Sequence, residues 1–268
     1  MSKSKNNYKA FFTGFASIAI PVIFVVAFCV FKYVLGNPGN FVDGNPDKHP
    51  LPGNFLGVIY KGGIIVPIIL SLLLMVLTFT VERFITITRA KGKGSIAAFV
   101  AGIHQLLAKG DIATAKVNCD SHRGSVANVI KAGLVKYEEM ITAKEHNKDQ
   151  KLVAIKQEFE EATSLELPML EQNLVVLATI ASIATLMGLL GTVIGMIKAF
   201  TAMAQAGAPD AVQLANGISE ALINTALGIG TSALAIIFYN YFTTQIDKMT
   251  YSIDEAGVAI TQNFAARY

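Results

Sequence analysis

Two apolar stretches in the second half of the sequence decide the fold. Residues 174–204 read LVVLATIASIATLMGLLGTVIGMIKAFTAMA, and residues 212–241 read VQLANGISEALINTALGIGTSALAIIFYNY. A helix needs about 20 apolar residues to cross the hydrocarbon core of a bilayer, and both stretches are longer than that. Two further apolar runs occupy residues 10–35 and 62–81. The sequence therefore predicts an all-α integral membrane protein with four transmembrane helices.

The composition agrees with a membrane location. The 268 residues are 53% hydrophobic and 15% charged, with a mean hydropathy of +0.50. Soluble domains average about 45–50% apolar and about 25% charged residues. The formal net charge of +3 is too small to suggest nucleic-acid binding.

The first apolar run has a basic start, which is also typical of a signal peptide. Its core is about 21 residues long, against about 7–15 in signal peptides, and no small-x-small cleavage site follows. We therefore expect an anchored helix, with a cleaved signal peptide as the alternative.

Lysine and arginine residues indicate the orientation. Basic residues flank the first two spans on one side: Lys3, Lys5, Lys9, Arg83, Arg89, Lys91 and Lys93. The loop at residues 36–61 carries only Lys48 and Lys61, and the hairpin at residues 206–211 has no basic residue. The positive-inside rule then predicts that both termini and the long middle region are cytoplasmic.

This orientation divides the chain into six regions. They are an N-terminal transmembrane helix (1–35), an irregular periplasmic loop (36–61), a second transmembrane helix (62–85), a cytoplasmic helical region (86–170), two pore-forming helices with a short periplasmic hairpin (171–245) and a cytoplasmic C-terminal helix (246–268).

Capping signals subdivide the cytoplasmic region. Ser95 is expected to cap a helix that Gly110 ends, Asp111 to start a short helix, and Ser125 to cap a third that runs to about Met140. From about residue 151 a helical pattern continues into the third span, with a kink or break near Pro168. The third helix would thus extend well beyond the membrane, and the polar but helix-compatible residues 243–263 suggest the same for the fourth.

Motifs for soluble chemistry are missing from the sequence. The segment Gly92-Lys93-Gly94-Ser95 lacks the glycine spacing of a phosphate-binding loop. The four histidines are scattered, no nucleophile–base set is evident, and Cys29 and Cys119 are expected to be unpaired. We expect no enzyme activity, metal or cofactor.

The fourth span carries a polar stripe. At about 100° per residue, its small and polar side chains fall in one arc of about 140°: Gly217, Glu220, Ala221, Asn224, Thr225, Gly228, Thr231, Ser232 and Ala235. A lipid-facing helix has no reason to segregate residues in this way. The stripe is expected to line a protein interior or a water-accessible pore.

The third span has a matching stripe of small residues and hydroxyls: Ala181, Thr185, Gly188, Thr192, Gly195 and Ala199, with Gly191 adding a small-xxx-small pair to Gly195. Small residues let membrane helices approach closely. Packing of helices three and four within one subunit would account for the glycines, but it leaves Glu220 unexplained.

Glu220 is the only carboxylate well inside an apolar span. An acid in this position is by default a functional hypothesis. Lys198 is a candidate partner, although its long side chain could also extend to the interface. Asn224 could donate to Glu220 one turn away or line the pore.

Two of these stretches resemble the ExbB/TolQ/MotA family of proton-channel subunits. Residues 188–196, GLLGTVIGM, resemble the family signature G-L-x-G-T-V-x-G-M. Residues 217–228, GISEALINTALG, resemble its signature G-I-x-E-A-L-x-x-T-A-x-G. The resemblance covers residues 165–247 well, residues 62–91 moderately and the middle region loosely. The two motifs are closer to those of ExbB and TolQ than to those of MotA.

The resemblance implies a homo-pentamer of long helices around a pore in the bacterial inner membrane. Two copies of an ExbD- or TolR-like single-span partner would insert there, and the partner's membrane Asp would carry the protons. Motion would pass to a TonB-like protein. By matching position, Thr192 and Thr225 would be the pore-facing hydroxyls and Glu220 the pore acid.

The sequence departs from the family pattern in three places. Thr185 stands where proline is usual, Asn224 replaces a small apolar residue, and the first span is absent from three-span ExbB proteins. A TolQ-like subunit for envelope integrity, a gliding or flagellar stator, a sodium-driven variant and a non-conducting scaffold remain as alternatives.

Overall fold

The computed structural model describes residues 2–46, 48–205 and 211–268. Regular structure in these ranges is helical, and their one β feature is an isolated bridge between Phe41 and Pro50. The chain forms two compact units. Unit 1 comprises Met1–Thr80 and Val176–Tyr239, and unit 2 comprises Val81–Val175 and Asn240–Tyr268.

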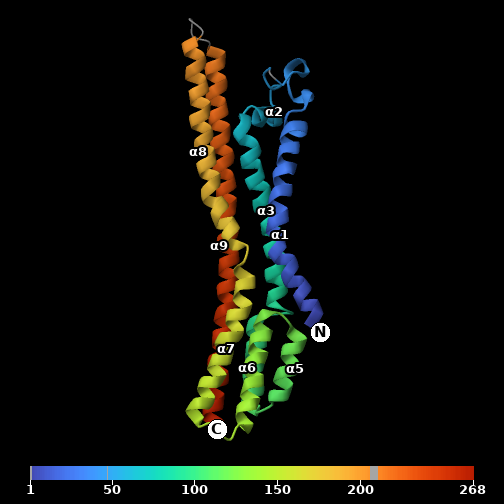
Figure 1. Cartoon of the computed structure of the whole chain (residues 1–268), viewed down its shortest axis with the longest axis vertical. Helices are drawn as coiled ribbons and strands as arrows, with labels where there is room; N and C mark the ends of the chain where they lie inside the picture. Colours follow the sequence, from blue (N-terminus) through green and yellow to red (C-terminus); the bar gives the residue numbers. More distant parts are fainter. Residues whose placement is uncertain (1, 47, 206–210) are drawn as a thin grey trace. The chain divides into compact units, whose positions relative to one another are not determined.

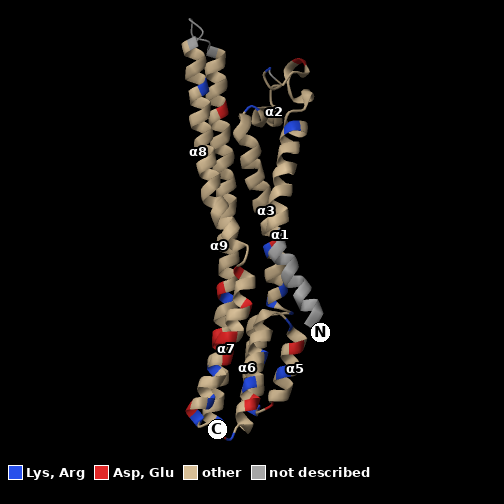
Figure 2. Cartoon of the chain, viewed as in Figure 1, with Lys and Arg blue, Asp and Glu red and all other residues tan. Residues whose placement is uncertain are grey.

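Four helical stretches are long and apolar enough to cross a membrane, as the sequence predicts. They belong to α1 (Ser2–Cys29) with the π-helix that follows it (Val30–Leu35), α3 (Val66–Lys91), α8 (Leu174–Gln205) and α9 (Ala211–Arg267) (Figure 1). Charged side chains are sparse along α8 (Figure 2). The expected hairpin between the last two spans falls mainly on residues 206–210, outside the described residues. The α9 helix continues without interruption through residues 243–263, as the sequence suggested.

Between the first two spans, the chain forms short turns rather than a long helix. Two 3-10 turns (Pro38–Asn40 and Val42–Gly44) precede the short helix α2 (Phe55–Tyr60) and a last turn at Gly63–Ile65. Asn37 and Asn54 cap two of these elements by accepting from Gly39 N and Gly57 N. The segment is irregular, as expected, and also ordered.

Unit 2 contains four helices between the second and third spans. They are α4 (Ile96–Lys109), α5 (Ile112–His122), α6 (Ser125–Thr142) and α7 (Lys148–Glu171). The caps at Ser95 and Asp111 and the left-handed Gly110 confirm the predicted boundaries. The prediction that Ser125 caps α6 is wrong, because Gly124, with φ +88°, precedes the helix and Ser125 is its first residue.

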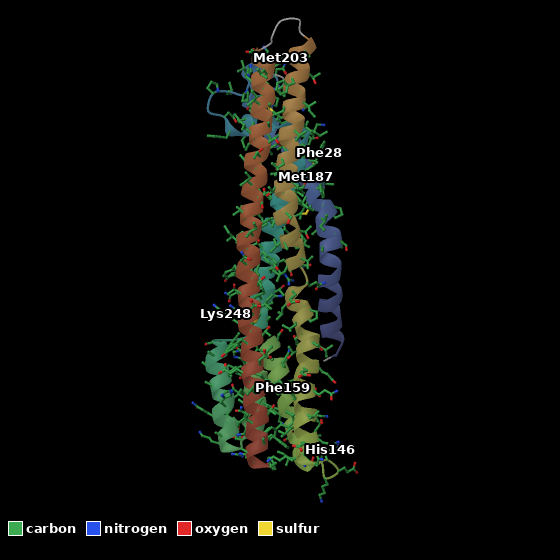
Figure 3. The ribbon with its side chains drawn as sticks, turned by 90° about the vertical axis from the view of Figure 1, so that its left-hand side faces the viewer. Phe28, His146, Phe159, Met187, Met203 and Lys248 are labelled. Carbon is green, nitrogen blue, oxygen red and sulfur yellow. The ribbon has the colours of Figure 1, made fainter. Side chains whose placement is uncertain are left out.

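The core of unit 2 gathers on the apolar face of α6. Tyr137 is buried, packs edge-on against Phe264 of α9 and donates to Asn263 Oδ1 at 2.9 Å. Gly133 leaves room for the ring of Phe159 on α7, which is labelled in Figure 3. The buried residues of α6 recur at i, i+3, i+4 spacing: Val126, Val129, Ile130, Gly133, Leu134 and Tyr137.

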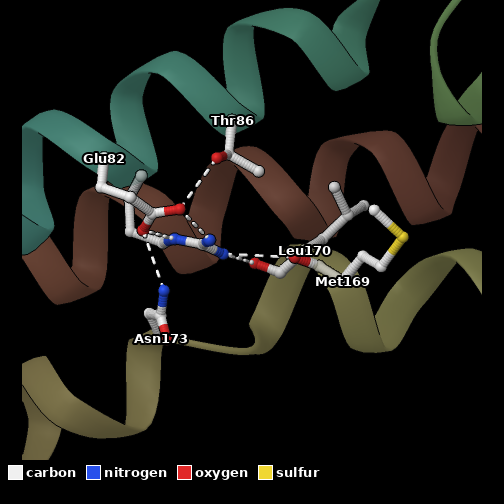
Figure 4. A network of polar contacts seen from close by, with 6 residues as sticks. Glu82, Thr86, Met169, Leu170 and Asn173 are labelled. Atoms are coloured by element: carbon white, nitrogen blue, oxygen red, sulfur yellow. Dashed lines mark hydrogen bonds and ion pairs between the residues drawn. The ribbon is translucent and has the colours of Figure 1, made fainter. Parts of the chain in front are cut away.

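A buried ion pair holds the break between α7 and α8 (Figure 4). Arg83 is 1% exposed and donates to both carboxylate oxygens of Glu82, at 2.6 and 2.5 Å. Its third nitrogen donates to the carbonyl oxygens of Leu170 and Met169, at 3.0 and 3.3 Å. Asn173 donates to Glu82 at 3.1 Å. Because the last carbonyls of a helix lack partners within it, Arg83 acts as the C-terminal cap of α7. This break follows Pro168 by a few residues, as predicted.

Candidate functional site

The glycines of α8 and α9 meet in a close helix–helix seam within unit 1. A Cβ atom placed on Gly228 would lie 2.8 Å from the Cα atom of Gly188 and 2.6 Å from the carbonyl oxygen of Ala184. One placed on Gly217 would lie 2.7 Å from the carbonyl oxygen of Gly195. Contacts this short leave no room for a side chain, so the stripes of small residues bring the two backbones together.

Asn224 lies at the centre of this seam and is fully buried. A side chain on Gly191 would collide with its Cβ, Cγ and Nδ2 atoms. The Nδ2 atom donates to the carbonyl oxygen of Gly62 at 2.8 Å, whereas Oδ1 has no donor among the described residues. The amide therefore ties α9 to the chain just before α3, instead of bonding to Glu220.

Glu220 lies one turn from Asn224 and is also buried. Its carboxylate accepts from Lys198 Nζ of α8 at 2.6 Å, with 11% of the Glu220 side chain exposed and 52% of the Lys198 side chain. The carboxylate presses against Gly63, where φ is +75° and a Cβ atom would collide with it. The sequence named Lys198 as a candidate partner, and the structure places it in contact.

The hydroxyls of the two stripes are not equivalent. Ser232 is buried and donates across the seam to Ala181 O at 2.5 Å, and Thr231 is 2% exposed. Thr192 and Thr225 are half-buried, and each donates to a carbonyl of its own helix, Leu189 O at 2.6 Å and Ala221 O at 3.1 Å. Thr185 is half-buried as well. A hydroxyl bonded in this way still has lone pairs that can accept a proton donor.

Sequence reasoning missed two polar features, one in the seam of unit 1 and one in unit 2. It gave no role to Gly62 and Gly63, although a Gly-Gly pair immediately before an apolar run is a visible signal for close backbone approach. It also used Arg83 only as an orientation signal and gave Glu82 no role. Adjacent opposite charges at the end of a span were the available signal for the buried pair.

Clusters of metal-ligating side chains are absent from the described part of the chain. No group of three or more His, Cys, Asp or Glu side chains there could hold a metal ion. The polar groups of the seam are instead an ion pair, an amide and several hydroxyls, which can position helices and accept hydrogen bonds from a partner.

Comparisons with known proteins match this region. The model for the MotA/TolQ/ExbB proton channel family matches residues 122–255, half of the chain. The Tol-Pal system protein TolQ of Haemophilus influenzae is 36% identical over 88 residues, which are 33% of this chain and 39% of that protein. The biopolymer transport protein ExbB of Salmonella typhimurium is 34% identical over 84 residues, or 31% and 34% of the two chains. TolQ of Pseudomonas aeruginosa is 30% identical over 124 residues, or 46% and 54%.

These matches extend over only part of each relative, from 34% to 54% of its length. The half-chain family match includes α8, α9 as far as residue 255, and the glycines of the seam between them. The family consists of transport and stator proteins, not enzymes, and its members take partners of the ExbD/TolR type. The chain belongs to the MotA/TolQ/ExbB proton channel family and is a multi-pass membrane protein of that family.

Proposed function

We propose that this chain is the ExbB-like subunit of an inner-membrane motor that is driven by the proton-motive force and energises TonB-dependent transport across the outer membrane. In this proposal five copies form a pore, and two copies of an ExbD-like single-span protein insert their helices in it. The termini and the helical region at residues 86–170 are cytoplasmic, and residues 36–61 are periplasmic. The motion passes to a TonB-like protein.

The observation that carries the proposal is the pairing of Glu220 with Lys198. Glu220 is the only carboxylate well inside a span of the sequence, and its charge is already matched at 2.6 Å. A channel that moves protons needs a group that can change its protonation state. Glu220 is the candidate acid of the spans in this sequence, and it is already paired with Lys198. We therefore assign the acid that gains and loses protons to a partner helix.

Thr192 and Thr225 are then the groups that meet the partner acid. They lie at the edge of the glycine seam, half-buried, whereas Asn224 and Ser232 are bonded inside it. A hollow of about 500 Å³ on α8 runs beside Thr192 and is lined by Val193, Met196, Ile197, Phe200 and Thr201. A helix packed there would place its side chains next to the Thr192 hydroxyl. Thr185, also half-buried, completes the proposed pore-side set, whereas Glu220 and Thr231 are buried within unit 1.

Exposed apolar side chains in unit 2 support the assembly of several copies. Val153, Leu165, Tyr251 and Val258 are 63%, 70%, 71% and 57% exposed. A groove of about 590 Å³ lies between α7 and α9, with Phe159, Leu167 and Ile253 in its lining. In the proposed assembly, contacts between neighbouring copies would cover these side chains and the groove.

The test is the substitution Thr225→Val in cells that depend on this chain and its ExbD-like partner. We expect normal assembly with the partner and loss of proton-driven uptake of a TonB-dependent cargo. Thr244→Val is the matched control, because Thr244 makes the same kind of bond to a carbonyl of its own helix, Asn240 O at 2.8 Å, outside the seam. Normal uptake by the Thr225 variant would refute the assigned role.

A TolQ-like role in envelope integrity is the second candidate, because TolQ relatives are as similar to this chain as ExbB relatives, at 36% and 34% identity. Deleting the gene separates the two functions. Loss of cargo uptake with an intact envelope favours the ExbB-like role, and detergent sensitivity with normal uptake favours the TolQ-like role. The same cells, assayed with the sodium gradient and then the proton gradient collapsed, identify the driving ion.

A further inference from the structure

The segment between the first two spans has a small core of its own. We call residues 36–65 the inter-span cap. The ring of Tyr60 stacks on Phe31, with centroids 4.7 Å apart, and meets Phe41 edge-on at 5.4 Å. Phe41 is 2% exposed and Leu35 is 5% exposed. The cap therefore packs onto the end of the first span as an ordered unit.

Buried amides fix the cap to that helix end. Asn40 donates to the carbonyl oxygens of Val34 and Leu35, both at 2.9 Å, and thereby satisfies two carbonyls that the helix end leaves free. Its own Oδ1 atom accepts from Asn54 at 3.0 Å, and Asn54 in turn caps α2. These bonds hold α2 in one orientation relative to the end of the first span.

The outward face of the cap is apolar. The inward side of α2 carries Gly57, where a Cβ atom would lie 2.8 Å from Asn40 O. Its opposite side presents Phe55 at 79% exposure, and Ile64, just before α3, is 72% exposed. Leu56 and Val58 are exposed too, and residues 49–60 contain no Lys, Arg, Asp or Glu. An uncharged apolar surface of this kind marks a site that binds either lipid or another protein surface.

The first candidate span, whose end the cap covers, also exposes large apolar side chains. On α1, Val25 and Phe28 are 64% and 58% exposed within an apolar candidate span. Phe28 is labelled in Figure 3. Tyr33 is 66% exposed at the end of that span, and tyrosine typically marks the membrane–water interface. Ile64 lies two residues before α3 begins and within the second candidate span, so the apolar side chains of the cap adjoin those of that span in the sequence.

We propose that the inter-span cap is a membrane-interface element: α2 lies in the headgroup region of the adjacent leaflet, with Phe55 and Ile64 inserted among the acyl chains. Short amphipathic segments bind bilayers in this way, with their apolar face buried about 5–10 Å at the headgroup boundary.

The absence of tryptophan from the sequence gives a direct test. Phe55→Trp creates a single fluorophore in the full-length protein, reconstituted with and without its partner in phosphatidylcholine vesicles. Brominated phosphatidylcholine quenches tryptophan in lipid, and acrylamide quenches it in water. Val25→Trp is the lipid control, and Val117→Trp, at a 66% exposed position of α5, is the aqueous control.

Phe55→Trp should be quenched by brominated lipid nearly as strongly as Val25→Trp and at least threefold more than Val117→Trp. Leu56→Trp, at a 44% exposed position of α2, should behave the same way and gives the readout if the Phe55 variant does not fold. Quenching by acrylamide at the level of Val117→Trp would overturn the proposal. Protection from both quenchers would overturn it as well, because protein and not lipid would then cover the cap.

Discussion

Replacing Arg83 by methionine is expected to destabilise unit 2 strongly. The guanidinium is 1% exposed and makes four hydrogen bonds, two to the Glu82 carboxylate and two to the last carbonyls of α7. Methionine has a similar length and fills part of the volume, so the loss is mainly one of charge and hydrogen bonds. Glu82, 8% exposed, would remain buried without its cation.

The expected magnitude follows from this geometry. Removing one partner of a buried ion pair destabilises proteins by about 3–5 kcal/mol, because the other charge stays uncompensated. In the double variant Glu82→Met/Arg83→Met no buried charge remains. It still leaves the α7 carbonyls and the amide of Asn173 without partners, at about 1 kcal/mol each. The double variant should therefore be more stable than the single one.

Cys119 provides the assay. Its thiol is 2% exposed, and burial raises its pKa to about 12, so that it reacts with a maleimide only after unit 2 opens. In a Cys29→Ser background, labelling during a thermal ramp of the detergent-solubilised protein gives a melting midpoint. Arg83→Met should lower the midpoint by about 10 °C or more. Arg89→Met, on the same helix at an exposed position, should leave it nearly unchanged. The reasoning fails if Arg83→Met and Arg89→Met have the same melting midpoint. It also fails if the double variant Glu82→Met/Arg83→Met has a lower midpoint than Arg83→Met.

Three further outcomes are expected. Gly228→Ala should lower the free energy of unfolding by about 1–3 kcal/mol, because the added Cβ atom would collide with the backbone of α8. Gly230→Ala, with open space around the added atom, should leave it unchanged or raise it slightly, and denaturant titration of both variants measures the difference. Lys198→Glu should impair assembly with the partner, and the charge swap Lys198→Glu/Glu220→Lys should restore it, as measured by co-purification. If the charge swap does not restore assembly, the ion-pair role is contradicted. Desolvation lowers the pKa of His122 below its ordinary 6.5, so the unfolded state binds a proton there more readily than the folded state, and unit 2 should lose stability as the pH falls below about 6.5. Thermal melts between pH 5 and pH 8 should show a melting temperature that falls with pH, and His122→Phe should weaken this dependence.

Local signals in the sequence predicted the helices well. Ser95, Gly110 and Asp111 mark helix ends because each acts on the backbone within a few residues, and the structure confirms all three. The prediction failed at Ser125, where the choice of capping residue depends on backbone geometry. Gly124 adopts a positive φ and lies against Ala90 O and Gly92 N, a contact between segments that the local sequence does not encode.

For the candidate site too, the sequence predicted some features and left others open. The glycine stripes were visible from their spacing, but the sequence left open whether Lys198 reaches Glu220 or the interface, and whether Asn224 bonds to Glu220. Those choices depend on where Gly62 and Gly63 lie, more than 150 residues earlier in the chain. The assignment of Thr192 and Thr225 to a pore stays a prediction.

The sequence by itself therefore determined that the chain crosses a membrane and that two of its helices carry faces of small residues. The hydrocarbon core imposes length and apolarity on each span separately, and helical periodicity gathers residues of one kind on one face. Only the tertiary structure decided which polar groups are matched. Lys198 neutralises Glu220, Asn224 holds the carbonyl of Gly62, and Arg83 caps α7, because a buried charge or amide is stabilised by whichever partner the packing of distant segments brings within hydrogen-bond distance.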